Sequence, residues 1–449
     1  LSAARPSYKE PRPDYQKAPA RAGTAMAAAE SLCICLPEDK NLRRTQIYLM
    51  PPLFTKSSNM NRIRERVAAD GATALRLKYS PYYHHFDRQD GCRVWMDGRE
   101  LLLLSSNDYL GLNQHPKVVE AGQAAMREWG ASSTGSRVSN GGRSYHRRLE
   151  EKLAHFLGME DCHVHSAGYL SCMSAIQAFA QREDVILADR NIHSSLWTGI
   201  AASHARVEKF SHNNPNSLAR ALEFESPKKS KLLVFEGVYS MEGHIAPLPE
   251  FLEMAKTRNL FTVMDDAHGI GVLGPSGRGT AEHFDCMGQV DLVCGSLSKA
   301  LASTGGFIAG DKELLEYLRS HSKQTIFSAA ISPAQAACAE TALELLQESP
   351  LLLDRLRKNT ERYKTGLSAL NLDTWQSETA AVPLIIGDRV KAYRFWEHLL
   401  HLGVFTTISL PPSVPPKKEL IRTAISAVHA PAEIDHALEC ISTALKKIR

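Results

Sequence analysis

Short apolar runs that alternate with helical segments constrain the fold of this chain more than any other feature of its sequence. Six runs are rich in β-branched and apolar residues, and each ends on a polar or glycine residue or is directly followed by one: DCHVHSAG, DVILAD, ARVEKF, KLLVFEG, FTVMDDAH and QVDLVCGS. Helical periodicity precedes them in KVVEAGQAAMREWG and SYHRRLEEKLAHFLG. Alternation of this kind predicts an α/β fold with a largely parallel sheet. Because ligands bind at the carboxyl ends of parallel strands, the polar residues that end these runs are the candidates for a site.

The pattern changes after about residue 340. Long helices are expected at about 334–347 and 351–370, and AAVPLIIGD, a helix at about 390–402, VFTTISLPPSVPP, the strand LIRTAISAV and a helix from Ala432 follow. We therefore expect a large domain at 105–340 and a smaller α+β C-terminal domain at 341–449, preceded by an N-terminal segment at 60–104. That segment contains a short helix in MNRIRERVAADGATAL and a hairpin in RVWMDGRELLLL, with Asp97-Gly98 at its turn.

Residues 1–59 differ from the rest of the chain. They contain many Ala, Pro, Lys and Arg residues and few acids, and no helical or strand period persists. A transit peptide has such a composition, but four early prolines interrupt any amphipathic helix. We expect a disordered or unassigned extension, with Met60 as the favoured native start and Met26 and Met50 as its rivals.

Composition excludes several classes of protein. The longest purely aliphatic run, Leu101–Leu104, is far shorter than the roughly 20 apolar residues of a transmembrane helix. A net charge of +4 over 449 residues gives no argument for nucleic-acid binding. The nine cysteines form no C-x-x-C pair and are odd in number, which argues against a disulfide framework and a zinc site. We expect a cytoplasmic protein with reduced cysteines, no bound metal and no dinucleotide.

Lys299 is the first candidate for chemistry. It lies in GSLSKALASTGGFIAG, a glycine-rich segment after an apolar run, where burial would lower the pKa of its amine and make it nucleophilic. Ser296 and Ser298 place two hydroxyls just before it. The alternative is an exposed loop lysine, which is the commoner fate of this residue type.

Asp265 ends the run FTVMD, and His268 follows three residues later. A carboxylate at the end of a buried strand can pair with a buried cation. Pyridoxal phosphate (PLP) needs such a partner at its ring nitrogen to act as an electron sink, and His268 could reach its phenolic oxygen. The alternatives are a helix N-cap for Asp265 and a core histidine for His268.

Further candidates also follow apolar runs. His193 could lie flat on a planar ring, and Ser240 could bond a cofactor or simply form a turn. Gly168 and Tyr169 lie at a strand-to-helix junction, where backbone N–H groups suit a phosphate. Arg422, in LIRTAISAVH, is either a clamp for a carboxylate or a surface arginine.

Together and in this order, these segments resemble the α-oxoamine synthases, a PLP-dependent family with the transferase fold of type I. The resemblance runs from about residue 60 to the C-terminus and rests on nine segments: SNDYLGL, GSRVSNGGRSYHRRLE, AGYLS, NIHSS, EGVYSMEG, DDAHGIGVLG, GSLSKALASTGGFIAGD, FSAAISPA and RTAISAVH. The family's usual Asp-Glu-Ala-His-Ser reads Asp-Asp-Ala-His-Gly here. The pairing carboxylate and the histidine are both retained.

The resemblance implies a role for each candidate. Lys299 would bind PLP as an internal aldimine, Asp265 would pair with the ring nitrogen, His268 with the ring hydroxyl, and His193 would stack on the ring. Further cofactor contacts would come from Gly168, Tyr169, Ser240, Ser296 and Ser298, and from Ser328 and Ala329 of a neighbouring protomer. The family thus implies a homodimer with shared sites. Arg422 would hold the carboxylate of an amino acid, with Asn107 near the substrate.

The implied reaction is a decarboxylative condensation of a small amino acid with an acyl-CoA thioester, which gives an α-amino ketone, CoA and CO2. Serine is favoured, because the hydroxyl directly before Lys299 and the segment YSPYYHHFDRQDG are most similar to soluble serine palmitoyltransferase. The alternative is an 8-amino-7-oxononanoate synthase that uses alanine and a pimeloyl thioester. An aminotransferase of the same fold is a third reading. A silent partner subunit is a fourth, and the retained Lys299 argues against it.

Overall fold

The computed structural model describes residues 62–67, 80–223, 225–226, 228–411 and 413–448. All of them belong to one compact unit, Pro52–Arg449. The extension expected at 1–59 lies outside the described residues, as does most of the helix expected after it, of which residues 62–67 are helical. No helix in the described ranges combines the length and the apolar character that crossing a membrane requires.

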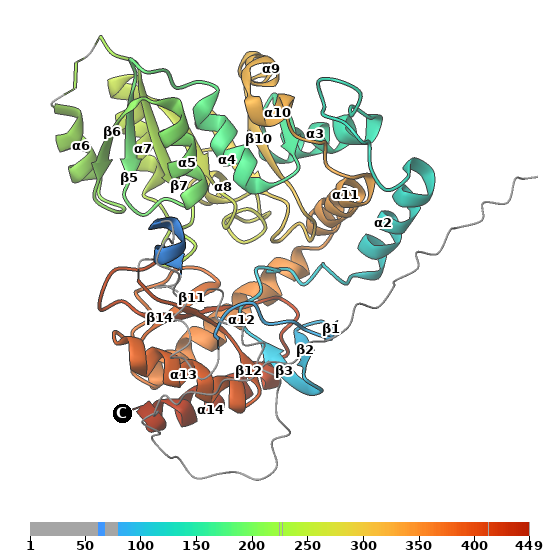
Figure 1. Ribbon diagram of the computed structural model, residues 1–449, viewed down its shortest axis with the longest axis vertical. Helices are drawn as coiled ribbons and strands as arrows, with labels where there is room; N and C mark the ends of the chain where they lie inside the picture. Colours follow the sequence, from blue (N-terminus) through green and yellow to red (C-terminus); the bar gives the residue numbers. More distant parts are fainter. Residues whose placement is uncertain (1–61, 68–79, 224, 227, 412, 449) are drawn as a thin grey trace, which may run out of the picture. The chain divides into compact units, whose positions relative to one another are not determined.

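A seven-stranded sheet forms the centre of the larger lobe (Figure 1). Its strands stand in the order β4 (Asp161–His165), β10 (Gly306–Gly310), β9 (Leu292–Ser296), β8 (Phe261–Asp265), β7 (Lys231–Glu236), β5 (Val185–Asp189) and β6 (Arg206–Phe210). Only β10 runs antiparallel to its neighbours. The predicted α/β fold with a largely parallel sheet is therefore confirmed.

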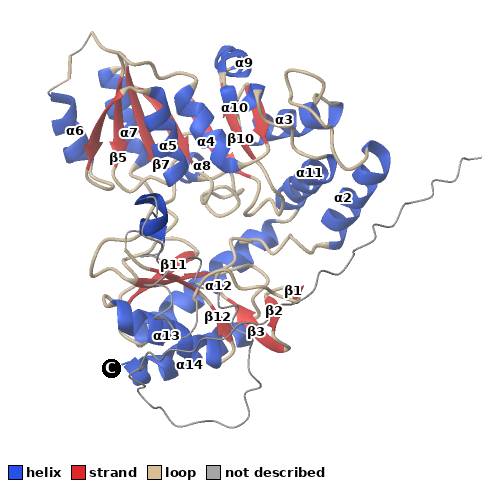
Figure 2. Cartoon of the chain, viewed as in Figure 1, coloured by secondary structure: helices blue, strands red, loops and turns tan. Residues whose placement is uncertain are grey.

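Helices flank this sheet on both sides (Figure 2). The helices of the larger lobe are α2 (Pro116–Trp129), α3 (Ser144–Leu157), α4 (Gly168–Gln177), α5 (Ser194–Ser203), α6 (Pro215–Glu223), α7 (Leu248–Arg258), α8 (Thr280–His283), α9 (Lys312–His321), α10 (Lys323–Ile326) and α11 (Pro333–Glu348), of which α2 packs on α11. Apart from the edge strand β6, the strands between them are almost wholly buried, because helices cover both faces. This burial explains why the strands read as continuous apolar runs rather than as alternating patterns.

The smaller lobe is built on an antiparallel sheet in the order β11 (Ala381–Ile385), β14 (Leu420–Ala424) and β13 (Thr407–Ser409). It is covered by α12 (Pro350–Ala369), α13 (Arg389–His401) and α14 (Pro431–Ile448). Tyr363, Trp396 and Ile441, one from each helix, are fully buried in a second hydrophobic core. This arrangement matches the α+β character expected after residue 340.

The predicted N-terminal hairpin forms with β2 (Arg93–Met96) and β3 (Arg99–Leu103), after a short strand β1 (Arg88–Asp90). Its turn residues Asp97 and Gly98 both have positive φ, as a type I′ turn requires. β3 also pairs in parallel with β12 (Val404–Phe405). The N-terminal strands thus share a sheet with a strand from the C-terminal part of the chain.

Helix α12 joins the two hydrophobic cores. Leu353 and Leu356, near its start, belong to the core of the larger lobe, whereas Tyr363 and Leu367 belong to the second core. The domain boundary predicted at residue 340 falls inside α11, whose buried residues pack into the larger core. The site described next lies where the two lobes face each other.

Candidate active site

The carboxyl ends of the central strands meet at two adjoining cavities. The smaller cavity has a volume of about 280 Å³ and the larger one of about 1160 Å³. Four residues line both: His193, Asp265, Ala267 and Lys299. Because parallel strands end at one edge of a sheet, residues that are far apart in sequence come together here.

Lys299 follows β9 and reaches both cavities. Burial lowers the pKa of its amine, and the carboxylate of Asp265 partly opposes that effect. Its side chain makes no hydrogen bond or ion pair within the part of the chain that the structure describes. An unpaired, desolvated amine at a cavity wall has the properties of a nucleophile or a proton acceptor.

Asp265 is the last residue of β8 and is 6% exposed. Its Oδ1 accepts a hydrogen bond from the backbone N–H of Ala267 at 3.1 Å, and its Oδ2 accepts one from the Cys172 thiol at 3.1 Å. The carboxylate is thus fixed beneath the smaller cavity and faces Lys299 and His193. Such a group can stabilise a buried cation.

Two histidines line this space as neutral rings. His193 is the N-cap of α5, where its Nδ1 accepts from the backbone N–H of Ser195 at 3.3 Å. His268 lies 2.7 Å from Tyr109, measured from Nδ1 to the hydroxyl oxygen. Burial lowers the pKa of both imidazoles. Lys299 lowers both further, whereas the carboxylate of Asp265 partly opposes the effect at His193.

A hydroxyl pair and a helix N-terminus face each other at the other end of the smaller cavity. Ser296 and Ser298 lie 2.7 Å apart, oxygen to oxygen, and Gly168 begins α4 opposite them. A Cβ at Gly168 would lie 3.1 Å from Ser296 Oγ, so glycine permits this close approach. The first N–H groups of a helix have no partner inside it and attract anions, so this end suits a phosphate.

Arg422 comes from β14 of the smaller lobe and is 8% exposed. It donates from Nε to the carbonyl oxygen of Ser240 at 2.9 Å, and from Nη2 to Oδ1 of Asn107 at 2.9 Å. All three residues line the larger cavity. No acid is paired with Arg422 among the described residues, so its charge is available to a carboxylate.

The segment Gly269–Gly274, GIGVLG, has the spacing G-x-G-x-x-G. This spacing indicates a dinucleotide site only where a helix opens directly after the strand. Here the segment forms turns, and the next helix, α8, begins only at Thr280. The spacing therefore lacks the strand-to-helix context of a dinucleotide fingerprint.

Comparisons with known proteins identify the family. The model of the family "Aminotransferase class I and II" matches residues 99–441. The chain belongs to this family. An 8-amino-7-oxononanoate synthase from Thermoanaerobacter pseudethanolicus is 38% identical over 359 residues, which cover 80% of this chain and 91% of the relative. A serine palmitoyltransferase from Bacteriovorax stolpii is 36% identical over 366 residues, covering 81% and 87%.

Solved structures agree with these relatives. The serine palmitoyltransferase of Sphingomonas wittichii superposes with a TM-score of 0.82 at 30% identity and covers 86% of this chain and 96% of its own. A serine palmitoyltransferase with a PLP internal aldimine gives a TM-score of 0.81 at 30% identity, covering 86% and 97%. The predicted membership of the α-oxoamine synthases and the fold of type I are therefore confirmed. As such a synthase, the protein is a PLP-dependent acyltransferase.

The residues of this α-oxoamine synthase fit the cofactor. An amine, a carboxylate at a strand end, a neutral imidazole and a hydroxyl pair at a helix N-terminus surround one small cavity. They would hold PLP by Lys299, Asp265, His193, Ser296 and Ser298. In the described ranges, no group of three or more His, Cys, Asp or Glu side chains is arranged to hold a metal ion.

Most of the predicted site residues line one of the two cavities. Those that do so are Asn107, Gly168, Tyr169, His193, Ser240, Asp265, His268, Ser296, Ser298, Lys299 and Arg422. Ser328 and Ala329 line neither cavity in their own chain. Ala329 instead forms an isolated bridge with Ser136. Their predicted contact with a neighbouring protomer stays a prediction.

Three residues near the reacting groups were missed by sequence reasoning. Tyr109 forms a hydrogen bond with His268, and Cys172 forms one with Asp265. Glu236, the last residue of β7, lines the larger cavity. Burial raises the pKa of the Glu236 carboxyl well above its usual range. Tyr109 and Glu236 lie inside segments that carried the resemblance, whereas Cys172 directly follows AGYLS and had no local signal.

Proposed function

We propose that the protein condenses a small amino acid, serine in first place, with an acyl-CoA thioester to give an α-amino ketone, CoA and CO2. One observation carries this proposal: the guanidinium of Arg422 and the amine of Lys299 line the same cavity, and neither has an acid in direct contact among the described residues. An amino acid offers a carboxylate to the first and its Cα proton to the second.

Each polar group then has a distinct task. Bound PLP supplies an electron sink for the charge that develops at Cα. Lys299, with its lowered pKa, accepts the Cα proton, and Asp265 stabilises positive charge on the cofactor ring. His193 would pack against the cofactor ring as a neutral imidazole, and His268, which contacts Tyr109, would offer a hydrogen bond to the ring oxygen.

The larger cavity offers a path for the acyl thioester. Beyond Lys299 it extends to Trp375 and to Pro411, Val414 and Pro415 of the smaller lobe. Apolar side chains on this side suit an acyl chain, whereas Arg422 and Asn107 keep the amino acid at the other side. Both substrates would therefore meet above the amine.

Serine and alanine are the two candidate amino acids. The serine assignment is supported by Ser298 directly before Lys299 and by the similarity to serine palmitoyltransferases of known structure. The alanine assignment, with a pimeloyl thioester, is supported by the similarity to 8-amino-7-oxononanoate synthases at 38% identity.

Product analysis separates these candidates. The purified enzyme with PLP is incubated with serine, alanine or glycine and with palmitoyl-CoA or pimeloyl-CoA, and products are identified by mass spectrometry. We expect a long-chain α-amino ketone from serine and palmitoyl-CoA. Product from alanine and pimeloyl-CoA alone would assign the enzyme to the second candidate. Formation of a 2-oxo acid and pyridoxamine phosphate instead would contradict both.

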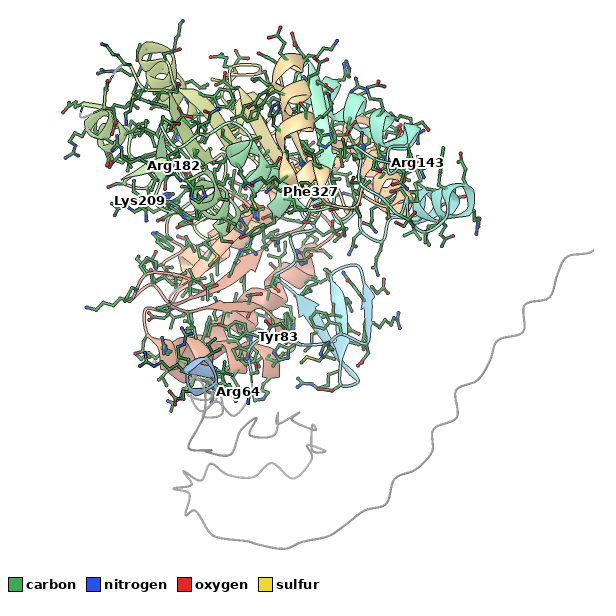
Figure 3. All side chains as sticks on the ribbon, turned by 45° about the horizontal axis from the view of Figure 1, so that its top comes forward. Arg64, Tyr83, Arg143, Arg182, Lys209 and Phe327 are labelled. Carbon is green, nitrogen blue, oxygen red and sulfur yellow. The ribbon has the colours of Figure 1, made fainter. Side chains whose placement is uncertain are left out.

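We also propose that the enzyme is a homodimer with shared sites. Phe327 (labelled in Figure 3) is 81% exposed, and it directly precedes Ser328 and Ala329, which line neither of the two cavities described above. A second copy would cover this aromatic ring. Ser328 and Ala329 of one protomer would then reach the phosphate site of the other. Sedimentation velocity tests the assembly. A dimer of wild-type protein that dissociates in Phe327→Asp is the expected result, and a wild-type monomer would contradict it.

A cytoplasmic location is the last part of the proposal. The described residues include seven cysteines, all free, and six of them are buried. Reduced cysteines are typical of proteins from the cytosol. Fractionation of cells that express the full chain, followed by detection with an antibody, would test the location, and recovery with the membrane or in the medium would contradict it.

A further inference from the structure

The carboxylate of Asp265 is held on both of its oxygens. The backbone N–H of Ala267 binds Oδ1, and this donor cannot be changed by substitution. The second donor is the thiol of Cys172, on α4, which binds Oδ2 at 3.1 Å. Cys172 is 4% exposed and lines the smaller cavity beside Asp265. Among the described residues that line the smaller cavity, Asp265 is the one acid, and the side chain of Cys172 contacts it.

The surroundings of Cys172 favour its protonated form. Cys294 on β9 is the register partner of Asp265 and interacts with Cys172. Contact with Cys294, burial and the charge of Asp265 all raise the pKa of the Cys172 thiol well above its ordinary value. A group that stays S–H remains a donor, so it attracts the carboxylate instead of repelling it.

A thiol is a weak hydrogen-bond donor. It can orient a carboxylate while withdrawing less of its negative charge than a hydroxyl or amide would. Most of that charge then remains for the cation that the carboxylate faces across the cavity. Other titratable groups also surround Asp265. They are its chain neighbour Asp266, Glu236 of β7, His193 before α5, Cys294 of β9 and Lys299 in the turn after β9.

We propose that Cys172 is a positioning residue for the reaction: its thiol orients Asp265 and sets how much charge that carboxylate presents to the cofactor ring. This inference rests on the proposed roles of Asp265 and Lys299. Without the thiol, Oδ2 loses its donor and the carboxylate turns more freely. Oδ2 also becomes more basic because no donor disperses its negative charge, so the carboxylate would stabilise a cation on the bound cofactor more strongly.

Cofactor binding and its spectrum test this role without any acyl substrate. In Cys172→Ala we expect PLP affinity to fall roughly tenfold, measured by fluorescence titration of the cofactor-free enzyme. The pH midpoint of the visible absorbance of the bound cofactor should move upward. Cys172→Ser keeps a donor of similar size, so it should restore the affinity toward wild type, and its midpoint should fall to or below the wild-type value because a hydroxyl is the stronger donor. A failed condensation reaction would overturn the proposed function and leave these two readouts intact.

Cys162→Ala is the matched control, because Cys162 is a fully buried thiol of β4 that does not contact Asp265. It should leave affinity and midpoint unchanged while it loses similar core volume. Wild-type affinity and midpoint in Cys172→Ala would overturn the proposal. So would an unrescued Cys172→Ser, or a Cys162→Ala variant that shifts as much as Cys172→Ala. Circular dichroism establishes that each variant is folded.

Discussion

The hydroxyl of Tyr109 lies 2.7 Å from Nδ1 of His268, and both side chains are buried. Burial raises the pKa of the Tyr109 hydroxyl and lowers that of the His268 imidazole, so neither group is charged. With the tyrosine as donor, the histidine carries its proton on Nε2. That nitrogen is then a donor toward an oxygen in the adjacent cavity.

Tyr109→Phe should therefore impair the reaction more than the fold. Without the hydroxyl, the proton of His268 is no longer held on Nε2 and can occupy Nδ1 instead. We expect kcat/KM to fall by about tenfold with PLP still bound. Tyr363→Phe is the control, since Tyr363 is a buried tyrosine that bonds Thr423 in the smaller lobe. Steady-state kinetics checks both variants. An unchanged kcat/KM in Tyr109→Phe would contradict the role.

Lys299 makes the stability of the cofactor-free enzyme depend on pH. Because burial lowers its pKa below 10.5, the folded state binds fewer protons than the unfolded state between the lowered pKa and that value. The free energy of unfolding should therefore rise as pH increases through this window. Below the window the buried cation is destabilising.

Lys299→Met removes this dependence. At neutral pH the cofactor-free variant should be more stable than the cofactor-free wild type, and the difference should shrink as pH rises toward 10.5. Urea unfolding at several pH values measures it. Lys312→Met, on the exposed surface of α9, controls for the loss of a lysine. A difference that stays constant with pH would refute the argument.

Much of this site could be predicted from the sequence because strand ends are visible in it. Asp265 and Ser296 end apolar runs, and Lys299 follows the same run as Ser296, so the α/β pattern alone brings them to one edge. The partners that orient them could not be predicted. Cys172 lies 93 residues from Asp265, and Tyr109 lies 159 residues from His268. Such contacts depend on how helices and loops pack.

One strand of the central sheet was also missed. β10 reads GFIAG, and glycine is depleted in strands, so propensity disfavours it. The glycine has a packing reason. A Cβ at Gly306 would lie 2.3 Å from Cα of Gly168, where α4 begins. Glycine at this position has a low β-strand propensity, but it leaves the space in which the N-terminus of α4 approaches the cavity.

Arg422 provides a second test of the site. Arg422→Lys keeps the charge but cannot bond Ser240, Asn107 and a carboxylate together, because it lacks the planar fork. We expect KM for the amino acid to rise roughly tenfold or more, with KM for the acyl thioester nearly unchanged. Arg362→Lys, at an exposed ion pair with Asp435, is the control. Equal changes in both KM values would argue for a structural role instead.

A chain of hydrogen bonds joins the lobes beside the larger cavity. His212 contacts Asp189 with one ring nitrogen and His244 with the other, the latter at 2.9 Å. His244 in turn donates to the carbonyl of Trp375, whose side chain lines the cavity. The backbone of Trp375 is therefore held by a histidine of the larger lobe.

His244→Ala should release Trp375 and widen the acyl side of the cavity. We expect KM for the acyl thioester to rise several-fold, about the effect of one lost hydrogen bond, while KM for the amino acid changes little. His155→Ala, an exposed residue of α3, is the control. Kinetics with thioesters of several chain lengths provides the measurement. The same KM for every thioester as in wild type would show that the contact does not position Trp375.

Gly269 replaces the serine that the family usually carries, and Asp266 explains why. The Asp266 carboxylate is buried and accepts from the backbone N–H of Thr280 at 2.7 Å and from its hydroxyl at 2.6 Å. A Cβ at position 269 would lie 2.0 Å from Oδ1 of Asp266. Gly269→Ala should therefore destabilise the fold by about 1–3 kcal/mol, because the bonded carboxylate cannot move aside. Gly142→Ala, whose Cβ would meet its nearest atom at 3.5 Å, should cost far less in the same thermal unfolding assay. Equal losses of stability in the two variants would mean that Asp266 does not impose glycine at 269.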